Sequence, residues 1–81
     1  MITQMNGFLL DESMGEFLAN DGRIVQYHNA RFYDNDERKL VKVSIPENHN
    51  ALPEQQVNCV VILRVKAGEK FCKLEFDSYE L

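Results

Sequence analysis

Hydrophobic residues recur at every second position along much of the chain, which is the period of a β-strand rather than of a helix. The alternation is cleanest in residues 39–45, where Val41, Val43 and Ile45 take every second position. Pro46 follows directly, and it ends the strand because proline has no N–H to donate to a sheet. This segment predicts a strand with one buried face.

The same pattern predicts further strands at residues 14–19, 23–33, 57–66 and 70–79, with a short first strand or arm within residues 1–13. Asn20-Asp21-Gly22 separates two of these strands, and Asp-Gly between apolar segments is a strong signal for a hairpin turn. A polar loop is expected at residues 34–37. Residues 46–56 form the longest connection, in which Pro53 could begin a short helical turn.

Short strands separated by turns about every ten residues are typical of small barrels and sandwiches. We therefore expect one all-β domain over residues 1–81, with little helix. Its architecture would be a five-stranded OB-like barrel or a curled antiparallel sheet. A chain of 81 residues buries a small core, so we also expect self-association into an oligomer.

The phases of the strands predict which side chains fill the core. The expected core comprises Leu18, Ile24, Ala30, Phe32, Val41, Val43, Ile45, Val57, Cys59, Val61, Leu63, Val65, Cys72, Leu74 and Phe76. Both cysteines are in phase with these apolar residues, which predicts buried thiols, although strands paired in register would also allow a disulfide. The two cysteines lack the spacing of a zinc site.

The opposite phases gather six of the nine basic residues and four of the eight aromatic ones, while the acidic residues are expected in loops and at strand ends. Surfaces that bind single-stranded nucleic acid combine cations for the phosphates with aromatic rings for the bases. The candidate nucleic-acid-binding residues are Arg23, Tyr27, Arg31, Tyr33, Lys42, Arg64, Lys66, Phe71 and Lys73. The same residue types are also ordinary on a solvated sheet face, and the net charge of −4 opposes a nucleic-acid partner.

Val60 and Ile62 are apolar but out of phase with the core, and a strand that is apolar on both faces is usually covered. Either residues 8–10 (Phe-Leu-Leu) or a second copy of the chain could cover them. This pattern gives an alternative function, a small acidic protein-interaction or structural module with its interface at Val60 and Ile62.

No pattern indicates catalysis, a metal site or a cofactor. His28 and His49 lie far apart in the sequence and have no ligand-spaced neighbours, and neither a nucleophile elbow nor a phosphate-binding glycine loop occurs. Residues 34–37 resemble the start of a calcium loop, but they lack its glycine and distal glutamate, so we expect a solvated turn. We therefore expect no enzyme.

Apolar segments are too short to span a membrane, and residues 1–10 contain no basic residue of a signal peptide. A cytoplasmic location without a membrane partner is therefore expected.

Three short segments resemble known small OB-like proteins: residues 41–46 (VKVSIP), residues 15–17 (GEF) and the spacing of Gly22 and Tyr27. They are similar to single-stranded-DNA-binding proteins of the filamentous-phage gene V type. With Leu10-Asp11, they also resemble small proteins of Gram-positive integrative conjugative elements.

The resemblance extends loosely over residues 9–79 and implies an OB-type barrel, a dimer and non-specific binding of single-stranded DNA by a phage or mobile-element accessory protein. It would place the binding aromatics at Tyr27 and Tyr33 and basic positions at Arg23, Arg31 and Lys42. The chain departs from the phage proteins in its acidic balance and in the turn at residues 67–69 (Ala-Gly-Glu), which is neither basic nor glycine-rich.

Overall fold

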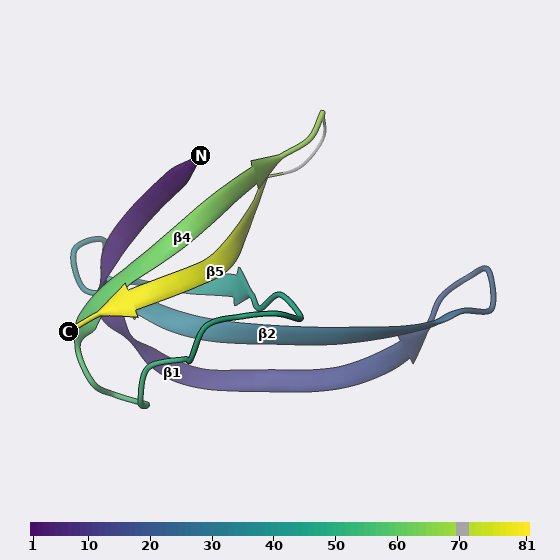
Figure 1. Ribbon diagram of the computed structural model, residues 1–81, viewed down its shortest axis with the longest axis horizontal. Coiled ribbons are helices and arrows are strands. Elements are labelled where there is room, and N and C mark those ends of the chain that lie inside the picture. Colours follow the sequence, from purple (N-terminus) through teal and green to yellow (C-terminus); the bar gives the residue numbers. More distant parts are fainter. Residues whose placement is uncertain (70–71) are drawn as a thin grey trace.

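A computed structural model describes residues 1–69 and 72–81, and it confirms the all-β prediction (Figure 1). Its elements are β1 (Ile2–Leu18), β2 (Ile24–Asp34), β3 (Lys39–Ser44), β4 (Cys59–Ala67) and β5 (Cys72–Glu80). These described residues contain no helix. No helical turn forms at Pro53; instead, Gln55 forms an isolated parallel bridge with Leu9, and Gln56 follows in a turn with a φ of 63°.

The five strands close into a barrel in the order β1-β2-β3-β5-β4, which is the predicted OB-like architecture. β1 makes the closure possible because its first half pairs with β4 and its second half with β2. All neighbouring strands are antiparallel except β3 and β5. Those two strands meet in parallel through a single residue pair, Ser44 and Glu75.

Apolar side chains from all five strands fill the barrel. Phe32 and Phe76 lie at its centre with parallel rings whose centroids are 6.2 Å apart. The buried hydrophobic residues are Met5, Leu9, Ala30, Phe32, Val43, Ile45, Cys59, Val61, Leu63 and Phe76, with Val41, Leu52, Leu74 and Tyr79 packed against them. Most of the predicted core is therefore confirmed, and half-buried Val65 lies at its margin.

Four predicted core residues are exposed. Leu18 and Ile24 are in the inward phase, but their strands have left the barrel at that point, so the side chains are 72% and 67% exposed. Val57 precedes β4 and is 38% exposed. Cys72 is exposed and begins β5 next to the connection from β4, opposite Ala67, the last residue of β4. For Leu18, Ile24 and Cys72 the strand phase was right and the barrel did not extend far enough, whereas Val57 lies outside the strand predicted to contain it.

β1 is one continuous strand of 17 residues, where the sequence predicted a short arm and a separate strand. The acidic stretch after Leu10 suggested a break, but it pairs with β2 without interruption. A bulge between Leu9 and Asp11 switches the inward-facing phase from odd to even positions. Met5 and Leu9 therefore enter the core, which the sequence analysis did not predict.

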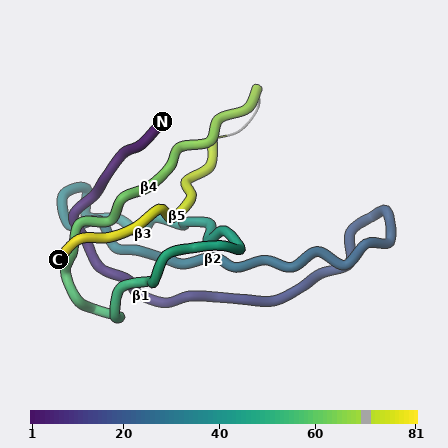
Figure 2. The backbone as a smooth tube through the Cα atoms, viewed as in Figure 1, coloured from purple at the N-terminus to yellow at the C-terminus, as the bar shows by residue number. Residues whose placement is uncertain are grey.

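The second half of β1 and the first half of β2 extend beyond the barrel as a two-stranded arm, residues 12–28 (Figures 1 and 2). β3 pairs with β2 only over residues 29–34, and β4 pairs with β1 only over residues 2–7. The arm turns at the predicted Asn20-Asp21-Gly22, where Gly22 has a φ of 88°. Its length helps to make the chain elongated, with extents of 41 × 28 × 23 Å.

Candidate nucleic-acid interface

Cross-strand pairing arranges the outward side chains of β1, β2 and β3 in rows. Opposite residues in paired strands project from the same face. One row contains Asp11, Arg31 and Lys42, and the next contains Ser13, Asn29 and Ser44. Tyr27 follows on β2, opposite Gly15. The candidate residues Tyr27, Arg31 and Lys42 are thus neighbours on one face.

This face contains two adjoining depressions of about 490 and 450 Å³, which share Asn29 and Lys42. The first extends to Tyr27 and Arg31, and the second crosses to Lys73 on β5. We call the combined surface the β2–β3 groove; it comprises Asp11, Glu12, Ser13, Tyr27, Asn29, Arg31, Lys42, Ser44, Cys72, Lys73 and Leu74. Four of its eleven residues are candidates from the sequence (Tyr27, Arg31, Lys42 and Lys73), and the fold brings these four together from three strands.

Tyr27 presents an aromatic ring at one end of the groove, and it is 40% exposed. The ring lies against β1 where Gly15 has no side chain: a Cβ at this position would be 2.5 Å from the Tyr27 hydroxyl oxygen. Phe17 flanks the ring with a centroid distance of 6.3 Å. Gly15 therefore permits the position of a ring whose exposed surface could stack on a base.

The cations of the groove differ in their pairing. The Arg31 guanidinium donates to both carboxylate oxygens of Asp11, from Nε at 2.8 Å and from Nη2. This contact holds the pKa of Asp11 below its usual value and raises the pKa of Arg31. Within residues 1–69 and 72–81, neither Lys42 nor Lys73 forms an ion pair. The two lysines are therefore the cations most available to an anionic ligand.

Arg64 and Lys66 share the outer face with Lys73, but carboxylates of β5 neutralise them. Lys66 Nζ is 3.1 Å from Glu75 Oε2, and Arg64 lies 3.7 Å from Glu75 and 3.4 Å from Asp77. The Glu75 side chain is only 10% exposed, so these cations compensate a nearly buried charge. Acidic residues were expected in loops and at strand ends; Asp11 and Glu75 instead lie within strands, beside the cations.

Arg23 and Tyr33, two of the remaining candidate nucleic-acid-binding residues, do not line the groove. Arg23 is at the tip of the arm, where its Nε donates to Asp21 at 2.6 Å. Tyr33 is outward on β2, but one side of its ring is stacked on Phe8 at 5.4 Å. Phe71 lies outside the described residues.

Val60 and Ile62 are outward on β4 and half-buried, between β1 and β5. Of residues 8–10, Leu9 enters the core and Phe8 stacks on Tyr33. β1 flanks the apolar strip along one edge and β5 along the other.

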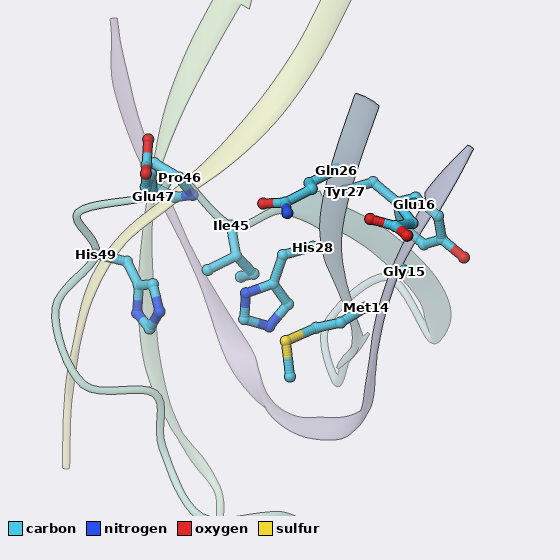
Figure 3. Close-up of a pocket in the computed structure, with 10 residues that line it drawn as sticks. All are labelled: Met14, Gly15, Glu16, Gln26, Tyr27, His28, Ile45, Pro46, Glu47 and His49. Atoms are coloured by element: carbon cyan, nitrogen blue, oxygen red, sulfur yellow. The ribbon is translucent and has the colours of Figure 1, made fainter. Parts of the chain in front are cut away.

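A third depression, of about 560 Å³, lies on the other face of the arm, at its base (Figure 3). His28 and Met14 point into it from the arm, and His49 faces them from the connection after β3. His28 Nε2 is 2.7 Å from Glu12, and the two imidazole rings are 5.6 Å apart. No group of three metal-ligating side chains occurs in the described parts of the chain. No sequence pattern indicated this pocket, because its two histidines are 21 residues apart.

The turn at residues 35–38 has a structural explanation. Asp34, which is buried, accepts hydrogen bonds from the backbone amides of Asp36 and Glu37 at 3.0 and 3.1 Å. Its carboxylate therefore organises the connection between β2 and β3, as an aspartate commonly does in turns.

No known protein family, curated protein or solved structure matches the chain. The resemblance to phage and conjugative-element proteins therefore stays a prediction. Among the described residues, no helix is long and apolar enough to cross a membrane.

Proposed function

We propose that the chain binds single-stranded nucleic acid, most simply DNA, along the β2–β3 groove without catalysing a reaction. The observation that carries the proposal is the combination of two lysines without carboxylate partners, Lys42 and Lys73, with the exposed ring of Tyr27 on one continuous surface. Phosphates would contact the lysines and a base would stack on the ring. Asn29 and Ser44 lie between them and offer hydrogen-bonding groups.

The acidic balance of the chain is compatible with this proposal because the charges are unevenly distributed. Two carboxylates neutralise Arg64 and Lys66 on the far side of Lys73, and Asp11 neutralises Arg31. The groove thus retains few available cations, and we expect weak to moderate affinity with a shallow dependence on salt.

The fold adds support by analogy. OB-folds bind oligonucleotides on the face of their second and third strands, between the connection of strands 1 and 2 and that of strands 4 and 5. In this chain that face is the β2–β3 groove, and the arm forms the first of these connections. This support is at the level of the fold alone, because one fold serves many functions.

The test is a titration of a fluorescently labelled oligothymidylate with the purified protein, followed by anisotropy over a series of salt concentrations. Lys42→Ala and Lys73→Ala should each weaken binding and reduce the slope of log K against log salt by about 0.7, because each removes one phosphate contact. Lys39→Ala is the matched control. It removes the same charge from the same strand as Lys42 but lies outside the groove.

Absence of binding at low salt would refute the proposal. Equal losses in Lys39→Ala and Lys42→Ala would show that only net charge matters, and the groove would then have no special role.

A second candidate function, a protein-association module, is favoured by the arm. Met14, Leu18 and Ile24 are each more than half exposed there. Exposed apolar side chains on a projecting element are typical of an interface.

A further inference from the structure

The arm has an unpaired edge that the barrel does not cover. β3 leaves β2 at Asn29, where Pro46 turns the chain away, so no described strand pairs with β2 from Ile24 to Tyr27 on that side. A two-stranded ribbon is marginally stable by itself in water. Open strand edges are also templates for pairing with another chain.

Two hydrogen bonds show which backbone groups this edge presents. The Ile45 N–H donates to the His28 carbonyl oxygen at 2.9 Å, so the backbone of His28 points away from β1. The Ala19 N–H donates to the Arg23 carbonyl oxygen at 2.8 Å, so the backbone of Arg23 points toward β1. Because these directions alternate along a strand, the N–H and C=O groups of Ile24 and Gln26 face the open edge.

The two edges of the arm differ in charge. The open edge of β1 includes Asp11, Glu12 and Glu16, and a second copy paired there would place carboxylates close together. The edge of β2 from Ile24 to Asn29 carries no carboxylate, lysine or arginine, and it contains β-branched and aromatic residues that suit a sheet. Charge thus favours the edge of β2, rather than that of β1, for contact with a second copy.

We propose that two copies of the chain associate through the β2 edges of their arms and form a four-stranded antiparallel sheet, β1-β2-β2-β1. The pairing is centred on Val25, which lies opposite Val25 of the second copy. In this register Ile24 of each copy pairs with Gln26 of the other, so the backbone groups that face the open edge are all used. The contact is symmetric, as expected for a dimer with a two-fold axis.

The side chains fit this register on both faces. Phe17 lies opposite Val25 within one arm, so the dimer contains a continuous apolar row of two phenylalanines and two valines. Arg23 of one copy lies opposite Tyr27 of the other, a pairing that permits a cation–π contact. Ile24, which is 67% exposed in one copy, becomes partly covered by Gln26 of the second.

Sedimentation equilibrium of the full chain without nucleic acid tests this contact independently of the proposed binding function. Gln26→Pro removes the edge N–H of β2 and leaves the hydrogen bonds to β1 intact, as proline is tolerated at strand edges. Glu16→Pro is the matched control. Glu16 lies opposite Gln26 in the same arm, and its N–H faces the other edge. Gln26→Pro should raise the dimer dissociation constant at least about tenfold, while Glu16→Pro should change it little.

Charge substitutions at Val25 provide a second test that does not depend on proline. Val25→Lys and Val25→Glu should each be monomeric, because like charges would lie opposite each other across the two-fold axis. An equimolar mixture of the two variants should form a heterodimer, which neither unfolding nor a remote effect would produce.

Three results would overturn the proposal. The wild-type chain could remain monomeric at the highest concentration measured. Glu16→Pro could weaken the dimer as much as Gln26→Pro. The mixture of the two Val25 variants could stay monomeric while each variant is folded.

Discussion

Removing the carboxylate that occupies Arg31 should strengthen nucleic-acid binding. The Arg31 guanidinium donates two hydrogen bonds to Asp11, so a phosphate must compete with that carboxylate. Asp11→Asn abolishes the charge of the competitor and leaves the side chain nearly the same size. The pair is exposed, so the loss should change the stability of the fold little.

The expected magnitude follows from the number of available cations. Each phosphate contact on a single strand contributes about −0.7 to the slope of log K against log salt, so Lys42 and Lys73 together predict a slope of about −1.4. With Arg31 released, the slope should become about −2.1. The ratio of variant to wild-type affinity should then be about 2.6-fold larger in 50 mM salt than in 200 mM salt.

Anisotropy titrations of a labelled oligothymidylate over this salt range measure the slope directly. Asp36→Asn is the matched control, because Asp36 has the same charge but contacts the Asn6 amide rather than an arginine. An unchanged slope in Asp11→Asn, or the same increase in Asp36→Asn, would refute the reasoning.

The direction in which nucleic-acid binding changes with pH follows from the Asp11–Arg31 ion pair. Arg31 lowers the pKa of Asp11, so the ion pair persists above the ordinary pKa of an aspartate and is lost only as the pH falls through the lowered value. Wild-type binding should approach that of Asp11→Asn only in this acidic range.

Two further predictions concern the barrel and its thiols. Gly7→Ala would place a Cβ 1.9 Å from the Tyr33 carbonyl oxygen, so β1 and β2 must separate; we expect a loss of about 3 kcal/mol, measured by urea unfolding. A midpoint within the error of the wild type would contradict this geometry. Cys72 is exposed, whereas burial shields Cys59 and raises its pKa, so iodoacetamide should alkylate Cys72 first. Bound single-stranded DNA should slow the alkylation of Cys72, because this residue lines the groove. Preferential labelling of Cys59 would be inconsistent with the fold.

The barrel could be predicted from the sequence because its period-two pattern is a local property. Val43, Val61 and Leu63 follow the inward phase of strands whose neighbours cover them fully. The hairpin at Asn20-Asp21-Gly22 was also predictable, since Asp and Gly have a defined conformational role in turns.

The arm could not be predicted from the same pattern. Leu18 and Ile24 have the phase of core residues, and only the tertiary structure shows that no other strand reaches them. The bulge after Leu9 likewise has no proline or glycine that would reveal it, although it reverses which residues of β1 face inward.

The groove was predicted in part. The phases predicted that Tyr27, Arg31 and Lys42 face outward, and the pairing of β2 with β3 brings them onto one surface. Phase alone cannot show that a strand far along the chain supplies a counter-charge. The pairing of Arg64 with Glu75 depends on the β4–β5 register, so the sequence overestimated the number of available cations.

The junction between β3 and β5 has a single residue pair, the fewest of any junction in the barrel, and we call it the β3–β5 seam. Every other junction between neighbouring strands has at least six paired residues, so the seam should open at the lowest cost in free energy and expose the central phenylalanines transiently. The groove crosses this seam, with Lys42 and Ser44 on one side and Lys73 on the other. A ligand that contacts both β3 and β5 would bind the closed barrel in preference to the opened one. Binding would therefore raise the free energy of opening and stabilise the fold.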